Sequence, residues 1–239
     1  MKPIIIYCIA SCFGLCLDHH PSLGQYYGDE EISSDHLIPW VVDSIHTYSQ
    51  TYHFGFSEGE CELRIIMDND IKVAQICGFE FSSDDTLWLR TYRNLTDVRI
   101  EGTKFFSMET NGEFMNYDNG KSSHFGLLLY APWTVEFAEG GEFGGVYPDK
   151  KVYLVGKYPQ ASLKILTENE LDDLSWRELK IMRNEIFARY GYIFRQGGEM
   201  GRYFGQQKWY HPQHKDVNRF LTVIEKKNIQ AILKKEREE

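Results

Sequence analysis

The sequence predicts an α+β protein, in which an N-terminal antiparallel β-sheet is followed by a small C-terminal helical domain. In residues 52–158 apolar and polar side chains alternate with a period of two, which is typical of strands with one covered face. After Pro159 the apolar spacing changes to that of helices, and helix-capping motifs appear. Because proline disfavours helix at the residue before it, we expect residues 157–160 to form a hinge between a β-rich domain (25–158) and a helical domain (159–239).

The β-rich part predicts short strands joined by short turns, as an antiparallel meander that is either a curved open sheet or a closed barrel-like one. The strongest turn signal is Asn111-Gly112, because a type I′ hairpin turn needs positive φ at both central residues. Residues 138–145 are so rich in glycine that they predict a flexible loop. The expected strands are residues 52–56, 61–67, 71–81, 86–92, 98–101, 104–109, 113–117, 123–130 and 151–155.

The helical part contains three capping boxes, each with a Ser or Thr N-cap and a glutamate three residues later. The second of them opens a helix over residues 176–190, which Gly191 ends at the C′ position. A short helix is expected within residues 198–206, and the third box opens a terminal helix whose isoleucines face inward. The capping pairs are Thr167 with Glu170, Ser175 with Glu178, and Thr222 with Glu225.

The first 24 residues have the layout of a secretory signal peptide. Met1-Lys2 is a positive start, residues 3–17 are almost wholly apolar, and Ser22-Leu23-Gly24 is a small-x-small cleavage site. The apolar run is shorter than the ~20 residues that span a bilayer. The sequence therefore predicts a bacterial protein that is periplasmic, displayed at the cell surface or secreted. The alternative is a lipoprotein anchored through Cys12, which ends a lipobox-like string.

Removal of this leader leaves two cysteines, Cys61 and Cys77, an even number in an oxidising compartment. Folding the hairpin between them about Asn69 places the two cysteines opposite each other on one face. Cysteines opposite each other in this way come within disulfide reach. The spacing therefore predicts a Cys61–Cys77 disulfide.

Composition excludes some functions. The net charge is −9, which argues against binding to nucleic acid or anionic lipid, because such binding depends on cationic contacts to phosphate. No phosphate-binding loop, nucleophile elbow or zincin motif occurs. His211 and His214 lack a third ligand at a recognisable spacing, so we predict neither a metal nor a cofactor. A glycosidase with paired carboxylates would leave no motif, and a hydrolase therefore stays open.

The helix over residues 176–190 carries the main candidate site residues. Arg183 falls in the middle of its apolar face, so it needs a carboxylate, several carbonyls or an anionic ligand. We favour a structural pairing with a neighbouring loop or helix. Glu185 and Arg189 are spaced to pair along the helix, with Arg189 on a more exposed face. Asn184 points away from the apolar face and is expected to bond nearby backbone.

The string Phe187-Ala188-Arg189-Tyr190-Gly191, with Lys208-Trp209-Tyr210 and residues 225–229 downstream, resembles the YARHG domain, a presumed extracellular bacterial module. The resemblance covers roughly the last seventy residues and implies an exported protein with a helical end. If the family residues form a site, this chain matches it with Arg183, Asn184, Glu185 and Arg189. Trp209 and Tyr210 are ligand-binding candidates that more simply pack their loop onto the helices. Tyr190 replaces the family's histidine, which disfavours histidine chemistry.

Two functions remain. The first is a non-enzymatic envelope protein that binds cell-wall glycan, another envelope protein or a small ligand. The alternative is a cell-wall hydrolase that uses carboxylates of the β-rich domain. The sequence predicts no membrane span and does not indicate an oligomeric state.

Overall fold

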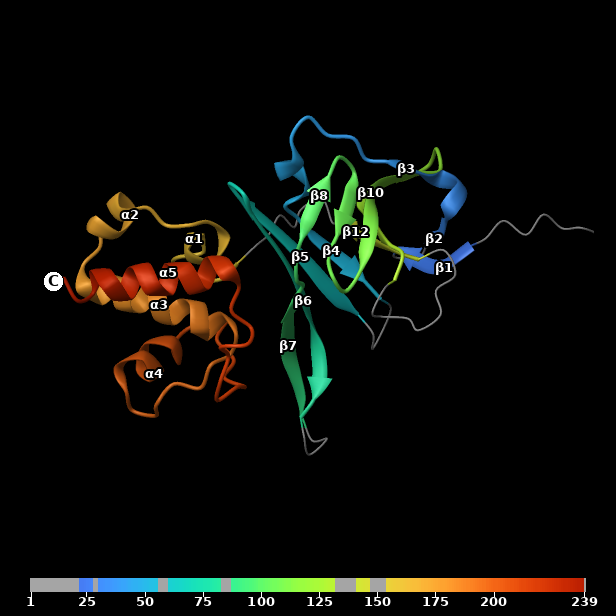
Figure 1. Ribbon diagram of the computed structural model, residues 1–239. Coiled ribbons are helices and arrows are strands. Elements are labelled where there is room, and N and C mark those ends of the chain that lie inside the picture. Colours follow the sequence, from blue (N-terminus) through green and yellow to red (C-terminus); the bar gives the residue numbers. More distant parts are fainter. Residues whose placement is uncertain are drawn as a thin grey trace, which may run out of the picture.

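The computed structural model describes residues 22–27, 30–55, 60–82, 87–131, 141–146 and 154–238. Residues 1–21 of the predicted signal peptide, including Cys12, lie outside this set. Most of the strand expected at residues 151–155 also lies outside it, and Leu154 and Val155 are not in a strand. Figure 1 shows a curled sheet beside a group of helices, which confirms the predicted α+β class.

Within the described residues, strands β3 to β12 form one antiparallel sheet, and β1 (Ser22–Tyr27) pairs separately with β2 (Glu30–Ser33). The main sheet has the order β7-β6-β5-β4-β12-β11-β10-β9-β8, with β3 beside β10. Its strands are β3 (Leu37–Pro39), β4 (Thr51–Phe54), β5 (Cys61–Asp68), β6 (Ile71–Phe81), β7 (Trp88–Asn94), β8 (Arg99–Glu101), β9 (Lys104–Phe106), β10 (Asn111–Asp118), β11 (Ser123–Leu129) and β12 (Glu142–Val146).

The sheet consists of two meanders, β4–β7 and β8–β12, joined where β12 pairs with β4. It curls into a half-barrel whose concave side holds an aromatic core. The rings of Tyr48 and Phe114 stack there with centroids 3.8 Å apart, and Tyr52, Phe54 and Phe105 are fully buried beside them. The alternating pattern therefore has the expected result, because every second residue of a strand points to this interior.

The helical part follows directly. Its helices are α1 (Gln160–Leu163), α2 (Glu168–Asp172), α3 (Trp176–Arg189), α4 (Glu199–Phe204) and α5 (Val223–Lys235), and two 3-10 turns precede β3 and β4 at Ser34–His36 and Ile45–Tyr48. All three predicted capping boxes are present. Gly191 has a φ of 71° after α3, as the predicted C′ position requires.

The glycine-rich stretch is not a loop throughout. Glu142–Val146 forms β12, at the centre of the sheet between β11 and β4. The prediction of a flexible loop is wrong here because these glycines serve packing. A Cβ at Gly144 would collide with the ring of Phe54, and one at Gly126 with the ring of Phe143. Glycine thus makes room for core aromatics, which composition alone does not reveal.

The turn predicted at Asn111-Gly112 is also misplaced. Both residues lie inside β10, and Asn111 pairs with Phe106. The turn is at residues 107–110, where the Ser107 amide donates to the Thr110 carbonyl at 2.9 Å. Gly112 is needed for close approach of two strands, since a Cβ would collide with the Leu128 carbonyl.

The predicted Cys61–Cys77 disulfide is not formed. The β5–β6 hairpin has a two-residue turn, with Asp68 opposite Ile71, so Cys77 faces Glu62. A hairpin folded about Asn69 would pair Cys77 with Cys61, which is one residue away from the observed register. A shift of one residue moves a side chain to the other face of the sheet. Cys61 packs against the half-barrel core, whereas Cys77 belongs to the helical core.

Candidate functional site

The convex face of β4–β7 carries polar side chains and is covered by the helical part. In the register of β4 and β5, Thr51 is opposite Arg64 and His53 is opposite Glu62. Arg64 is also opposite Gln75 of β6, so these side chains share one face. A polar face of this kind usually contacts water, but Gln75 is only 2% exposed. The helical part must therefore supply its hydrogen-bonding partners.

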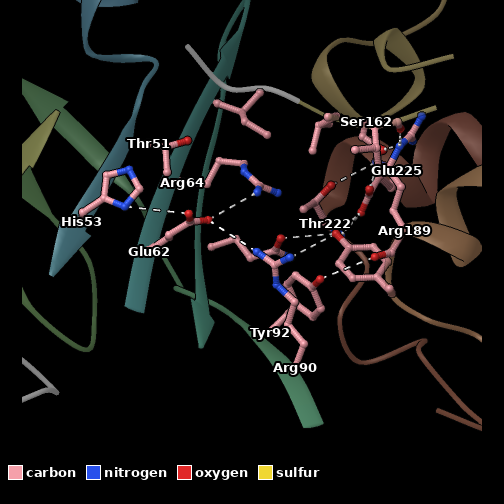
Figure 2. A pocket seen from close by; sticks show the side chains of 15 residues that line it. Thr51, His53, Glu62, Arg64, Arg90, Tyr92, Ser162, Arg189, Thr222 and Glu225 are labelled. Carbon is pink, nitrogen blue, oxygen red and sulfur yellow. Dashed lines mark hydrogen bonds and ion pairs between the residues drawn. The ribbon is translucent and has the colours of Figure 1, made fainter. Parts of the chain in front are cut away.

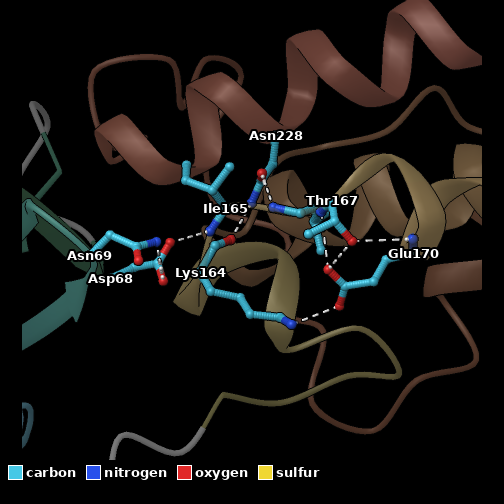
Figure 3. A network of polar contacts seen from close by, with 8 residues as sticks. Asp68, Asn69, Lys164, Ile165, Thr167, Glu170 and Asn228 are labelled. Carbon is cyan, nitrogen blue, oxygen red and sulfur yellow. Dashed lines mark hydrogen bonds and ion pairs between the residues drawn. The ribbon is translucent and has the colours of Figure 1, made fainter.

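Hydrogen bonds connect this face to the helical part at several points. The Gln75 side-chain amide donates to the Phe220 carbonyl at 2.7 Å, and Asn94 donates to the same carbonyl at 3.1 Å. At the tip of the β5–β6 hairpin, Asp68 accepts the Ile165 amide at 2.7 Å (Figure 3). These contacts fix the sheet relative to the helices.

A cavity of about 390 Å³ lies between the two parts (Figure 2). This volume falls within the range of small-molecule sites. Its wall combines charged, hydroxyl and aromatic side chains that come from segments far apart in the sequence. The sheet contributes Thr51, His53, Glu62, Arg64, Arg90 and Tyr92, and the helical part contributes Ser162, Arg189, Tyr190, Thr222 and Glu225.

On the helical side Arg189 is buried and fully engaged. Its Nε donates to the Val155 carbonyl at 2.8 Å, one terminal nitrogen donates to the Ser162 hydroxyl at 2.9 Å, and the other pairs with Glu185. Glu185 also accepts the backbone amides of residues 157 and 158, both at 2.7 Å. Burial lowers the pKa of Arg189, and the charge of Glu185 opposes that shift. The predicted Glu185–Arg189 pair is confirmed.

The expected exposure of Arg189 is wrong. Its side chain is 6% exposed, because the chain entering the helical part passes over that side of α3. Gly156 permits this path: its φ is 112°, and a Cβ there would collide with the Glu185 carboxyl group. The loop covers a helix face that the helical periodicity alone assigns to solvent.

Glu225 and Tyr190 occupy the back of the cavity. The Glu225 carboxylate accepts the Ser162 hydroxyl at 2.6 Å, the Tyr190 hydroxyl at 2.7 Å and the Thr222 amide at 2.9 Å. Gln75 donates to the same tyrosine hydroxyl at 3.2 Å. Burial, with the nearby Glu225 charge, raises the pKa of Tyr190. The residue that replaces the family's histidine is thus a neutral link between α3, α5 and the sheet.

On the sheet side one carboxylate faces three basic groups. Glu62 lies 3.7 Å from an Arg90 nitrogen, 3.9 Å from an Arg64 nitrogen and 3.8 Å from His53 Nδ1. These are longer than charge-assisted hydrogen bonds, which are about 2.7–2.9 Å. The Nε of Arg64 is buried and has no hydrogen-bond partner in the described part of the chain. This side of the cavity therefore contains hydrogen-bonding capacity that the described residues do not use.

The Arg90 guanidinium also contacts Cys77, but this hydrogen bond is weak. Its Nε donates to Cys77 Sγ at 3.0 Å, and a thiol is a weak acceptor. Burial raises the pKa of the Cys77 thiol despite the nearby Arg90 charge, which favours the neutral form. The charge of Arg90 is consequently balanced by Glu62, which also faces Arg64.

Of the predicted site residues, only Arg189 lines the cavity, with Glu185 directly behind it. Arg183 forms a bidentate pair with Glu236, with both distances 3.1 Å, and this ties α3 to the end of α5. The Asn184 amide donates to the Lys180 carbonyl at 2.7 Å. Tyr210 donates to the Tyr192 carbonyl at 2.6 Å, and Trp209 packs on Phe204, so the predicted packing of this loop is confirmed.

The sheet residues of the cavity are not among the predicted site residues, because alternating polar residues indicate a solvent-exposed face. One signal was available. Ile66, Val73 and Cys77 lie on this same face and are buried, and apolar residues at those positions indicate that something covers it. Ile66 and Val73 in fact pack with Ile224 of α5.

Residues 156–237 match the family model of the YARHG domain, so the helical part is a YARHG domain. Its presence is consistent with an envelope-associated module. No curated protein and no solved structure showed significant similarity to the chain. Among the described residues, none of the helices is long and apolar enough to cross a membrane.

Proposed function

We propose that this chain is an exported envelope protein that binds a small ligand, without catalysis, in the cavity between its sheet and its YARHG domain. The observation that carries this proposal is Arg64, which lines the cavity and whose buried Nε has no hydrogen-bond partner among the described residues. Unpaired buried polar groups are costly and mark positions where a ligand is expected. The signal peptide predicted at residues 1–24 and the YARHG domain support export.

The alternative, a cell-wall hydrolase, has less support. Such an enzyme needs two carboxyl groups that flank the substrate bond, one of them available as an acid. Glu225 already accepts three hydrogen bonds, from Ser162, Tyr190 and Thr222. Glu62 is the carboxylate that the sheet contributes to the cavity wall, and it faces three basic groups. Neither carboxylate is arranged as a proton donor.

The test is native mass spectrometry of the chain recovered outside the cytoplasm, with the parent compared to Leu154→Trp. Leu154 lines the cavity, so a larger side chain there fills it. Val41, which is 79% exposed, supplies the control Val41→Trp. We expect a small retained mass in the parent and the control and its loss in Leu154→Trp. The N-terminal sequence of the same sample should begin near Gln25. A parent without retained mass, or a cytoplasmic chain, would contradict the proposal.

A further inference from the structure

We infer that the ligand of this cavity carries a carboxylate group and that Arg64 is the residue that anchors it. This inference rests on the proposed function and adds the chemical class of the ligand. The site consists of the Arg64 guanidinium, the Arg90 guanidinium beside it and the Thr51 hydroxyl on the adjacent strand, all of which line the cavity (Figure 2).

The first argument is the unused hydrogen-bonding capacity of Arg64. A guanidinium has five N–H donors in a fixed plane, and its side chain here is only 13% exposed. Arg64 makes no side-chain hydrogen bond to a described residue: its Nε is buried without a partner, and its nearest carboxylate is 3.9 Å away. Burying donors of a charged group without hydrogen-bond partners is costly. Arg64 therefore lowers the stability of the folded protein.

A second arginine of the same chain shows what a completed pair looks like. Arg183 uses Nε and one terminal nitrogen to hold both oxygens of Glu236 at 3.1 Å. This side-on geometry is the one that a planar guanidinium and a planar carboxylate favour. In Arg64 no side-chain nitrogen has an oxygen of a described residue within hydrogen-bond distance. A carboxylate supplied by a ligand would complete such a pair.

The balance of charge places the anion on the sheet side of the cavity. Glu62 faces both Arg64 and Arg90, so two guanidinium charges share one carboxylate charge. On the helical side, by contrast, Arg189 is paired with Glu185, and the oxygens of Glu225 are occupied by hydrogen bonds. An anion is therefore attracted to Arg64 and Arg90 and not to the Glu225 end.

The remaining wall suits a small organic acid. Thr51 is directly opposite Arg64 across β4 and β5, and its side chain makes no hydrogen bond to the described residues, so its hydroxyl is available to the same group. Ile66, Leu154 and Val155 add apolar wall beside it. At about 390 Å³ the cavity has room for more than the carboxylate itself. The ligand class is a carboxylate-bearing small molecule, as opposed to a neutral sugar.

The experiment uses acetate and its neutral isostere acetamide as probes on the full mature chain. The readout is the Nε–Hε signal of Arg64 in NMR spectra, with inorganic phosphate as a third probe. We expect a saturable shift with acetate, none with acetamide, and a weaker response to phosphate. Equal shifts with acetamide, a shift that does not saturate, or stronger binding of phosphate would overturn the assignment.

Variants separate anchoring from folding. Acetate binding by the variants is followed through the Nε–Hε signal of Arg90, which lines the same cavity. Arg64→Gln and Arg64→Lys should each weaken it at least about tenfold, because neither offers the planar fork. Because Arg64 makes no hydrogen bond to a described residue, and Glu62 keeps its contact with Arg90, Arg64→Gln should melt at or above the parent temperature. The control Arg99→Gln, at a position whose side chain is 66% exposed, should bind acetate as the parent does. An Arg64→Gln protein that melts well below the parent would assign Arg64 a structural role and contradict the inference.

Native mass spectrometry of Arg64→Gln distinguishes this inference from the proposed function. Loss of the retained mass in Arg64→Gln supports both. A mass that is lost in Leu154→Trp and retained in Arg64→Gln would overturn the carboxylate anchor and uphold ligand binding in the cavity. A parent without retained mass and without a saturable acetate shift would overturn both.

Discussion

At the scale of single residues, Arg183 and Arg189 of α3 exchange the roles that helical periodicity assigns to them. The Arg183 side chain is 21% exposed and pairs with Glu236 at the end of α5. The Arg189 side chain is only 6% exposed, and together with Glu185 it binds the backbone of residues 155–158. Periodicity identifies the face that packs on other helices. It does not identify a face that a preceding loop covers.

Arg189→Ala should therefore destabilise the protein more than Arg183→Ala. Removing Arg189 leaves the buried Glu185 charge without its cation, at a cost of ~3–5 kcal/mol. Arg183→Ala loses two hydrogen bonds to Glu236, whose side chain is 10% exposed against 1% for Glu185, a loss of ~1.5–3 kcal/mol. Urea unfolding of both variants measures the two costs. A larger loss for Arg183→Ala would mean that the α3–α5 pair is the principal charge interaction of the domain.

The cysteines give a second prediction at this scale. Because Cys61 and Cys77 lie on opposite faces of the sheet, they should not be joined to each other in the mature protein. Peptide mass spectrometry after alkylation under denaturing conditions, without a reducing agent, should find both modified. Recovery of a linked Cys61–Cys77 peptide would show that β5 and β6 adopt a different register.

At the scale of elements, sequence signals that act through local backbone chemistry gave the right result and signals that depend on packing did not. The capping boxes and Gly191 act within one helix end, and the structure contains all of them. Gly112 is required by the close approach of the neighbouring strand, and Gly144 is required by the ring of Phe54. Neither requirement can be recognised from the residues nearby in the sequence. The cavity could not be predicted for the same reason, because its two walls meet only after folding.

The α1–α2 connection predicts a dependence on pH. Lys164 and the Thr167 hydrogen bonds lower the pKa of Glu170 from 4.5 to about 2 (Figure 3). A lowered folded-state pKa stabilises the fold above the unfolded value, and that contribution disappears as pH falls through the folded value. The stability difference between parent and Glu170→Gln should thus be present at pH 7 and vanish toward pH 2.

Urea unfolding at a series of pH values measures this difference. The Glu170 side chain is 34% exposed, so solvent screening keeps the difference at about 1 kcal/mol or less. Glu168→Gln, on the same helix and outside the capping pair, is the matched control and should follow the parent. A difference that is constant over pH would assign the effect to packing of the glutamate stem.

At the scale of the whole molecule, the sheet and the YARHG domain share their cores. Cys77 and Tyr92 of the sheet belong to the helical core, and Ile66 and Val73 pack with Ile224. The polar contacts of Gln75 and Asp68 add to this interface. The period change after Pro159 marks where the architecture changes, but it gives no indication of how tightly the two parts are joined.

The mature chain should accordingly unfold in one transition. Separating the parts would expose Tyr92 and Ile224 and leave buried hydrogen-bonding groups without partners, so neither part gains from unfolding alone. Differential scanning calorimetry and circular dichroism at two wavelengths test this. Two resolved transitions, or a fragment of residues 154–239 that melts as high as the whole chain, would contradict it.

The pairing of β4 with β12 has a consequence for the order of folding. Tyr52 of β4 meets Val146 of β12, so β4 acquires its second neighbour only after nearly the entire sheet sequence is available. Contacts so distant along the chain form slowly. Until they form, β4 and β12 each present an open strand edge, the feature that promotes pairing with other chains. A chain truncated before Glu142 lacks β12 and should consequently aggregate. Pairing of β4 with β12 is thus the folding step before which the nascent protein most needs protection from other chains.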